Sequence, residues 1–228
     1  AYEVDLLRKV YPNSLIQAFT KPAIWNEKND VHARKYDMIY CGTTLQETKN
    51  HQCFIQLLHH LDVYLDTKLR IAIAGNKADS KIFTSTFSYP FSNIEVFNEG
   101  EVSRDQLQNL FSQSKTMLVT SGRDANPRII QESLVHGARV LAINSLSDGL
   151  EFLKANPLLG SVLPSEPESW IYTRNGNLEF KSSTHLASLI AGEIERSNFP
   201  DLVMNISRKK LSVEESVRSL TNTVKSFR

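Results

Sequence analysis

The sequence predicts an α/β fold built on a doubly wound parallel sheet of about five to six strands, and two observations carry this prediction. Short apolar runs recur along the chain, and they are apolar at odd and even positions alike. Strands that are covered on both faces have this pattern, which is typical of parallel sheets. Stretches with helical spacing separate the runs, and such alternation is typical of sheets with right-handed crossovers.

The strands are expected at a series of apolar runs, which begins just after residue 35. They are YDMIYCG (36–42), LRIAIAG (69–75), NIEVFN (93–98), TMLVTS (116–121) and ARVLAI (138–143). Between the first two runs, residues 49–66 place their apolar side chains on one stripe of a helix. The stripe consists of Cys53, Phe54, Leu57, Leu58 and Leu61. We therefore expect an amphipathic helix to join the first two strands.

Two later helices carry signals at their ends. Ser103 is a plausible N-cap for a helix that buries Leu107, Leu110 and Phe111. The segment NPRIIQESLVHG predicts the other helix. Asn126 is its expected N-cap, Pro127 takes the first helical position and Gly137 ends the helix. Each of these helices therefore leads from one predicted strand to the next.

The ends of the chain are less regular. We interpret residues 1–35 as an irregular lead-in or linker and residues 36–228 as the domain itself. Two further helices are expected near the end of the chain, at 183–197 and 212–227.

Composition narrows the class of protein. Lys and Arg number 26 against 25 for Asp and Glu, a net charge of +1, so no basic surface for nucleic acid is expected. No apolar run approaches the roughly 20 residues that a membrane helix needs, and we expect neither a transmembrane segment nor a signal peptide. The two cysteines, Cys41 and Cys53, do not suggest a disulfide framework. We therefore expect a reducing, cytoplasmic compartment.

The loop after the first strand, CGTTLQETKN, carries a first candidate site. Gly42 ends the strand, Thr43 and Thr44 follow, and Lys49 stands at the start of the next helix. Glycine lets a backbone approach a ligand closely, and hydroxyls, a lysine and a helix N-terminus can together hold phosphate. The alternative is a solvated loop with an exposed lysine, because Gly and Thr are common in turns.

The loop SGRDANPRIIQE carries a second candidate. Pro127 has no N–H, so the free donors of the helix start come from Arg128 and Ile129, whose amides are a ready anion site. Asp124 lies in the loop and Glu132 on the helix, so two carboxylates flank that site. This arrangement suits a ligand with phosphate and hydroxyl groups, such as a nucleotide sugar. Alternatively, Glu132 pairs with Arg128 four residues earlier and Asp124 solvates a turn.

The order of the motifs completes the pattern. CGTTLQETKN is followed by LRIAIAG and EVFNEGEVSRDQLQNLFSQSKTMLVTS, and then by an acid, seven spacers and a glutamate in DANPRIIQE. This order resembles the C-terminal, donor-binding half of a GT-B glycosyltransferase, most closely glycosyltransferase family 4. The resemblance covers roughly residues 36–145 and extends loosely to the end of the chain. It implies a Rossmann-like domain that forms one half of a GT-B fold.

The resemblance also implies roles for particular residues. Asp124 would face the hydroxyls of the donor sugar near the reacting carbon, and Lys49 would neutralise the diphosphate; these two are the catalytic candidates. Glu132 would bind the ribose hydroxyls, and Val102 would line the base pocket. The remaining donor-binding candidates are Gly42, Thr43, Thr44, Asn126, Arg128 and Ile129.

The implied activity is transfer of a hexosyl or pentosyl group from a nucleoside diphosphate sugar to a glycan or other acceptor, with retention at the anomeric carbon. Positive charge on the diphosphate would stabilise the leaving group in place of a metal ion, so we expect no cofactor. The acceptor face belongs to the other half of a GT-B enzyme. We therefore expect a second domain or polypeptide to supply it.

Two positions depart from the family pattern. The family tends to have Arg where this chain has Thr43, and usually has Glu where it has Asp124. These departures leave a second hypothesis open: a non-catalytic GT-B-like binding or scaffold module that has lost transferase activity. A sugar epimerase of the same fold is a third possibility, and it too would need the other half.

Overall fold

The computed structural model describes residues 34–42, 49–75, 90–122, 128–143, 150–163, 170–172, 178–180, 183–212, 215 and 217–218. The strands are β1 (Tyr36–Cys41), β2 (Leu69–Ala74), β3 (Ile94–Gly100), β4 (Ser114–Val119), β5 (Arg139–Ile143), β6 (Gly160–Leu163), β7 (Trp170–Tyr172) and β8 (Leu178–Phe180). The helices are α2 (His51–Tyr64), α4 (Arg104–Ser112), α5 (Arg128–Val135), α6 (Leu150–Lys154), α7 (Ser183–Glu195) and α8 (Pro200–Lys210). The predicted helix at 212–227 and the lead-in fall mostly outside these residues.

The described strands form a six-stranded sheet in the order β3-β2-β1-β4-β5-β6, and a separate hairpin of β7 and β8. Every pair in the larger sheet is parallel, with Met38 of β1 level with Ile71 of β2 and with Thr116 of β4. The predicted α/β, doubly wound parallel sheet is confirmed. Residues 160–163 are a sixth strand that the apolar pattern did not predict.

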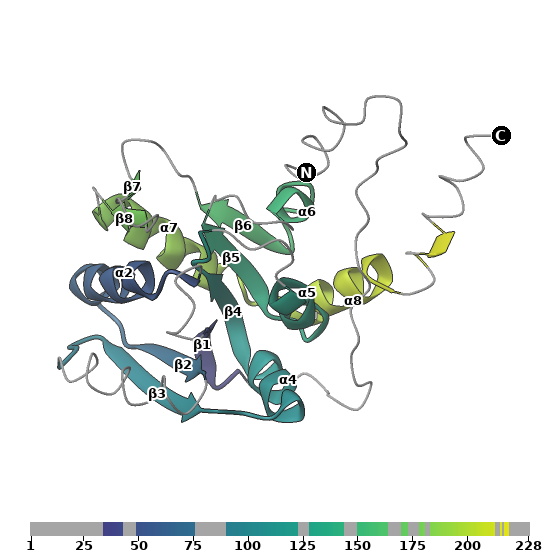
Figure 1. Cartoon of the computed structure of the whole chain (residues 1–228), viewed down its shortest axis with the longest axis horizontal. Coiled ribbons are helices and arrows are strands. Elements are labelled where there is room, and N and C mark those ends of the chain that lie inside the picture. The colour runs from purple at the N-terminus through teal and green to yellow at the C-terminus, as the bar shows by residue number, and fades with distance from the viewer. Residues whose placement is uncertain are drawn as a thin grey trace.

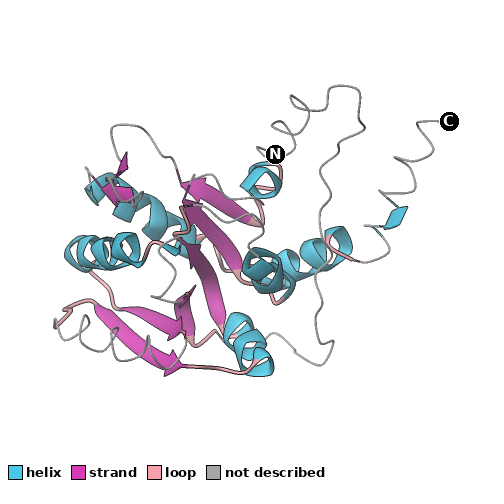
Figure 2. Cartoon of the chain, in the orientation of Figure 1, coloured by secondary structure: helices cyan, strands magenta, loops and turns pink. Residues whose placement is uncertain are grey.

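Helices cover both faces of the sheet (Figure 1). One face packs against α2 and α7 around Met38, Tyr40, Leu118 and Leu141. The other packs against α4, α5, α6 and α8 around neighbouring strand residues such as Ile39, Met117 and Val140. Successive strand residues point to opposite faces, so two apolar layers explain why the strands are apolar at both parities. Figure 2 shows this helix–sheet–helix layering by element type.

Local signals explain where α4 begins. The amide of Gln106 donates to the Ser103 hydroxyl at 3.3 Å, and the amide of Ser103 donates to the Gln106 side chain at 2.7 Å. This reciprocal pair is a capping box, which satisfies two amides that would otherwise lack partners. The predicted cap at Ser103 is therefore confirmed.

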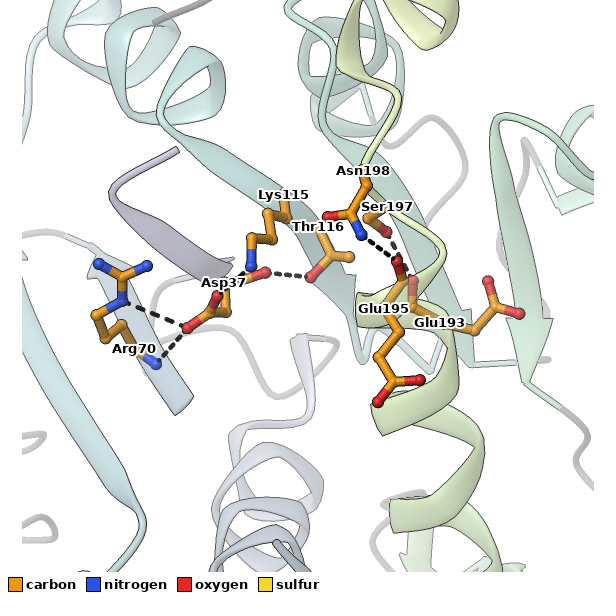
Figure 3. Close-up of polar contacts among 8 residues, drawn as sticks. All are labelled: Asp37, Arg70, Lys115, Thr116, Glu193, Glu195, Ser197 and Asn198. Atoms are coloured by element: carbon orange, nitrogen blue, oxygen red, sulfur yellow. Dashed lines mark hydrogen bonds and ion pairs between the residues drawn. The ribbon is translucent and has the colours of Figure 1, made fainter. Parts of the chain in front are cut away.

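A charged cluster joins the amino ends of the central strands (Figure 3). The Asp37 carboxylate is 2.8 Å from the Lys115 ammonium, and it accepts a hydrogen bond from the Arg70 amide at 2.9 Å. The Thr116 hydroxyl donates to the Asp37 carbonyl at 2.8 Å. Burial alone would raise the pKa of Asp37, but its contacts with Lys115 and Arg70 outweigh burial and lower it.

We expect Asp37→Asn to lower the free energy of unfolding by about 1 kcal/mol at neutral pH, because asparagine loses the charge that Lys115 and Arg70 contact. Since folding lowers the pKa of Asp37, its contribution is present above the ordinary value of 3.8 and is lost as the pH falls through the folded value. The difference between the two proteins should therefore shrink in urea titrations below that pH. Glu151→Gln is the control, because 66% of the Glu151 side chain is exposed. A constant difference at every pH would contradict the prediction.

Candidate functional site

The strand order reverses its direction of progression at the middle of the sheet, between β1 and β4. The chain runs outward from β1 through β2 to β3, then returns to β4 on the other side of β1. The segment after β1 leads to α2 on one face, and the segment after β4 leads to α5 on the opposite face. We call the place between β1 and β4, where the strand order reverses, the switch point. In open α/β sheets, ligands bind outside the carboxyl ends of the strands at such a switch point. The two loops that the sequence singled out, after Gly42 and after Ser121, both start there.

A buried hydrogen-bond cluster connects these two strand ends. The Thr120 hydroxyl donates to the Lys49 carbonyl at 2.7 Å, and the Tyr40 hydroxyl donates to the same carbonyl at 3.3 Å. The Tyr40 hydroxyl also lies 3.1 Å from Nδ1 of His51, the first residue of α2. The Tyr40 ring stacks on the Phe54 ring with the ring centroids 3.8 Å apart. The backbone of Lys49 is therefore anchored at the switch point.

Gly42 has a packing reason to be glycine. A Cβ at this position would lie 3.1 Å from Cε1 of His51 and 3.1 Å from the Tyr40 hydroxyl. Glycine thus lets the two rings meet beside the end of β1. The role of Gly42 in admitting a ligand stays a prediction.

The start of α2 has an unusual backbone. Asn50 caps the helix in the left-handed region, with φ 53° and ψ 55°, and its side-chain oxygen accepts from the Cys53 amide at 3.3 Å. It is the one non-glycine residue with positive φ among those the structure describes. Its side-chain Nδ2 is buried and has no hydrogen-bond partner within the same residues. Asparagine tolerates this conformation better than most residues, yet the conformation still stores strain.

On the face of the sheet opposite to α2, Glu132 lies on α5 with its carboxylate 3.2 Å from the Arg104 guanidinium of α4. The pair is part-exposed, with 20% of the Glu132 side chain and 56% of the Arg104 side chain accessible. Among the described residues, the ion-pair partner of Glu132 is Arg104, and not the Arg128 that helical spacing suggested. Burial raises the pKa of the Cys41 thiol at the end of β1, and the charge of Glu132 raises it further.

Several of the predicted site residues are described and others are not. Lys49 lies just before α2, on one side of the switch point, and Glu132 lies on α5, on the other side. Arg128 is the first residue of α5, and Ile129 is the second. Val102 lies just before α4 and packs against the apolar cluster on the α4 and α5 face. Thr43, Thr44, Asp124 and Asn126 lie outside the described residues. The distance between the Lys49 ammonium and the Arg128 amide, predicted to be short, stays a prediction.

Sequence reasoning missed Tyr40, Thr120 and Arg104. Tyr40 and Thr120 read as ordinary members of apolar strand runs. Arg104 reads as a surface residue of a capped helix. Only the packing of distant segments brings them to the site, since Thr120 and Lys49 are 71 residues apart.

The parallel sheet, with helices on both faces, defines a Rossmann-like α/β domain. No protein-family model and no curated sequence matches the chain. Among solved structures, a TarM variant of S. aureus in complex with fondaparinux, alpha-GlcNAc-glycerol and UDP is similar, with a TM-score of 0.58 and 16% identity over 95% of this chain.

Two further solved structures show the same fold. The pneumococcal O-GlcNAc transferase GtfA, in complex with UDP and GlcNAc, has a TM-score of 0.58 and 12% identity over 99% of this chain. A glycosyltransferase from Rickettsia africae ESF-5 has a TM-score of 0.55 and 14% identity over 99% of this chain. The matches cover 41%, 43% and 52% of those proteins, so the chain spans about two-fifths to one-half of their length. At these identities the likeness establishes the fold.

No helix within the described residues is both long and apolar enough to cross a membrane.

Proposed function

We propose that this chain is the nucleotide-sugar-binding domain of a retaining, family 4-like glycosyltransferase. It would be the C-terminal half of a GT-B enzyme that moves a sugar from a nucleoside diphosphate to a glycan or other acceptor in the cytoplasm. The observation that carries the proposal is the anchoring of Lys49 and the start of α2 at the switch point between β1 and β4. The similar structures with bound UDP support it through their fold.

The proposed site holds the donor along the carboxyl edge of the sheet. The diphosphate lies between Lys49 and the amides of Arg128 and Ile129, since helix N-termini and a cation both favour phosphate. Gly42, Thr43, Thr44 and Asn126 complete the phosphate-binding loops. At the nucleoside end, Glu132 accepts from the ribose hydroxyls and Val102 contacts the base. Asp124 faces the sugar near the carbon that is transferred.

Catalysis in this proposal is mainly electrostatic. As the bond to the sugar breaks, negative charge builds up on the departing diphosphate, and Lys49 with the α5 amides stabilises it. This places the required positive charge on the chain itself, without a metal ion. The acceptor binds to a second domain that faces the carboxyl edge of the sheet.

The first experiment is calorimetric titration of the chain with uridine diphosphate and guanosine diphosphate. Saturable binding of either one is expected, with a weaker response to the matching nucleoside, because Lys49 and the helix amides contact only the phosphates. Binding of neither would favour the scaffold alternative over the transferase.

A second prediction concerns Asp124. We expect Asp124→Asn to leave nucleoside diphosphate affinity nearly unchanged, because the partner of Asp124 is the sugar. In the enzyme with both halves, the same change should lower the rate of transfer by at least about tenfold, equivalent to about 1.4 kcal/mol of transition-state stabilisation. Comparing binding with turnover checks both statements. Full transfer activity in the variant would contradict the assignment.

A further inference from the structure

Thr120 connects β4 to the segment between β1 and α2. It does so beyond the point where the hydrogen-bonded pairing of β1 with β4 ends. The β1–β4 ladder ends at the pair of Tyr40 and Leu118, and Thr120 lies just beyond the end of β4. Its side chain is buried, with 1% of the residue exposed, and its hydroxyl donates to the Lys49 carbonyl at 2.7 Å. A side chain therefore makes the contact that a backbone amide would make within a sheet.

The proton count makes Thr120 the main donor to this carbonyl. A hydroxyl carries one proton. Among the described residues, the Tyr40 hydroxyl lies 3.3 Å from the Lys49 carbonyl and 3.1 Å from Nδ1 of His51. The Thr120 hydroxyl lies 2.7 Å from the Lys49 carbonyl oxygen and 3.4 Å from the Tyr40 hydroxyl. Because hydroxyl hydrogen bonds are strongest near 2.7–2.8 Å, Thr120 donates to Lys49. The Tyr40 hydroxyl makes a longer second contact with the same carbonyl, at 3.3 Å.

The bonded carbonyl belongs to the peptide between Lys49 and Asn50. The hydrogen bond fixes the orientation of that peptide plane. The next residue, Asn50, then adopts its left-handed conformation and caps α2. Such a conformation persists where surrounding contacts determine it. The same hydrogen bond therefore sets both the position of the Lys49 Cα atom and the point at which α2 begins.

We infer that Thr120, assisted by Tyr40, is a positioning residue for the phosphate end of the ligand. Its hydroxyl holds Lys49 and the start of α2 in the geometry that binds the diphosphate, without touching the ligand itself. This inference rests on the proposed function. It assigns to β4, the strand that precedes the Asp124 loop, control over the phosphate-binding segment that follows β1.

The test compares Thr120→Val with Thr120→Ser in the 228-residue chain. Valine keeps the shape and loses the donor, whereas serine keeps the donor. The ligands are uridine and guanosine diphosphates, with uridine and guanosine as the forms that lack phosphate. We expect Thr120→Val to weaken diphosphate binding roughly three- to tenfold, the ratio that loss of one hydrogen bond predicts, and to leave nucleoside binding unchanged. Thr120→Ser should bind as the wild type does.

Thr116→Val is the matched control. Thr116 is equally buried on the same strand, and its hydroxyl also donates to a carbonyl, that of Asp37, at 2.8 Å. Thr116 lies four residues before Thr120, about 13 Å along the strand, towards the amino end of β4. Thr116→Val should therefore lower the melting temperature as Thr120→Val does, with no change in diphosphate affinity. If Thr120→Val fails to fold, Tyr40→Phe tests the same anchor and should weaken diphosphate binding about twofold to threefold.

The outcomes separate the inference from the function on which it rests. If the wild type binds neither diphosphate, the proposed function is overturned and the inference with it. If the wild type binds and Thr120→Val binds equally well, only the inference is overturned. It is also overturned if Thr116→Val weakens binding as much, or if the nucleoside loses as much affinity as the diphosphate.

Discussion

Replacing Gly137 with alanine is expected to lower the free energy of unfolding by about 2–5 kcal/mol. Gly137 has φ +82°, which costs other residues about 1–2 kcal/mol. A Cβ there would also lie 2.6 Å from Nη2 of Arg34 and 2.8 Å from the Pro200 carbonyl oxygen, an overpacking that costs about 1–3 kcal/mol.

The structure around Gly137 leaves little room for relaxation. The Gly137 amide donates to the Leu134 carbonyl at 3.0 Å, and the Ala138 amide donates to the Ser133 carbonyl at 3.1 Å, which together close α5 in a Schellman motif. The Arg34 guanidinium donates to the Gly137 carbonyl at 3.1 Å. It also donates to the carbonyls of Phe111 and Ser114, so it ties α4, β4 and α5 together. A shift at Gly137 therefore disturbs three elements.

Gly100 and Gly192 provide the controls for Gly137→Ala. Gly100 has φ +64°, but no atom lies within 4 Å of the place that an added Cβ would take, so Gly100→Ala isolates the backbone cost of about 1–2 kcal/mol. Gly192 lies inside α7 with open space around it, so Gly192→Ala should stabilise by about 0.5–1 kcal/mol. Urea unfolding followed by circular dichroism measures all three. Equal losses for Gly137→Ala and Gly100→Ala would show that the contacts with Arg34 and Pro200 cost nothing.

The sequence was sufficient for β1 to β5 and insufficient for β6, which forms one edge of the sheet. β1, β2, β4 and β5 are apolar at both parities because helices cover both of their faces. β6 is only four residues long and only its first and last residues are buried, so its pattern is too short to distinguish from a loop. The caps at Ser103 and Gly137 were predictable because each depends on residues within one turn.

The candidate site was predictable in its parts and not in its connections. Gly42, Lys49 and Glu132 stand out because strand ends and helix starts can be located from periodicity. The contacts that organise them come from segments far apart in sequence, as with Thr120 and Lys49. Helical spacing suggested Arg128 as the partner of Glu132, but α4 packs beside α5 and brings Arg104 to it instead. Tertiary packing decided the pairing, and a local rule has no information about it.

The pairing of Glu132 with Arg104 sharpens a further prediction, that Glu132→Gln weakens nucleoside diphosphate binding by about 1–3 kcal/mol. The proposed partner of Glu132 is the ribose, whose hydroxyls donate more strongly to a carboxylate than to an amide. Only one carboxylate oxygen is engaged by Arg104 within the described residues. A part-exposed pair of this kind contributes about 0–1 kcal/mol to stability, so the fold should tolerate its loss.

Arg104→Gln separates the ribose role from the ion pair, because it removes the same pair from the other side. If Glu132 binds the ribose, Glu132→Gln should lose much more affinity than Arg104→Gln, while both variants unfold at nearly the same urea concentration. A diphosphate of 2′,3′-dideoxyuridine or 2′,3′-dideoxyguanosine, which lacks both ribose hydroxyls, should bind wild type and Glu132→Gln equally. Should Glu132→Gln bind the ordinary diphosphate as the wild type does, the carboxylate serves only to hold α5 against α4, and the ribose must be bound by other groups.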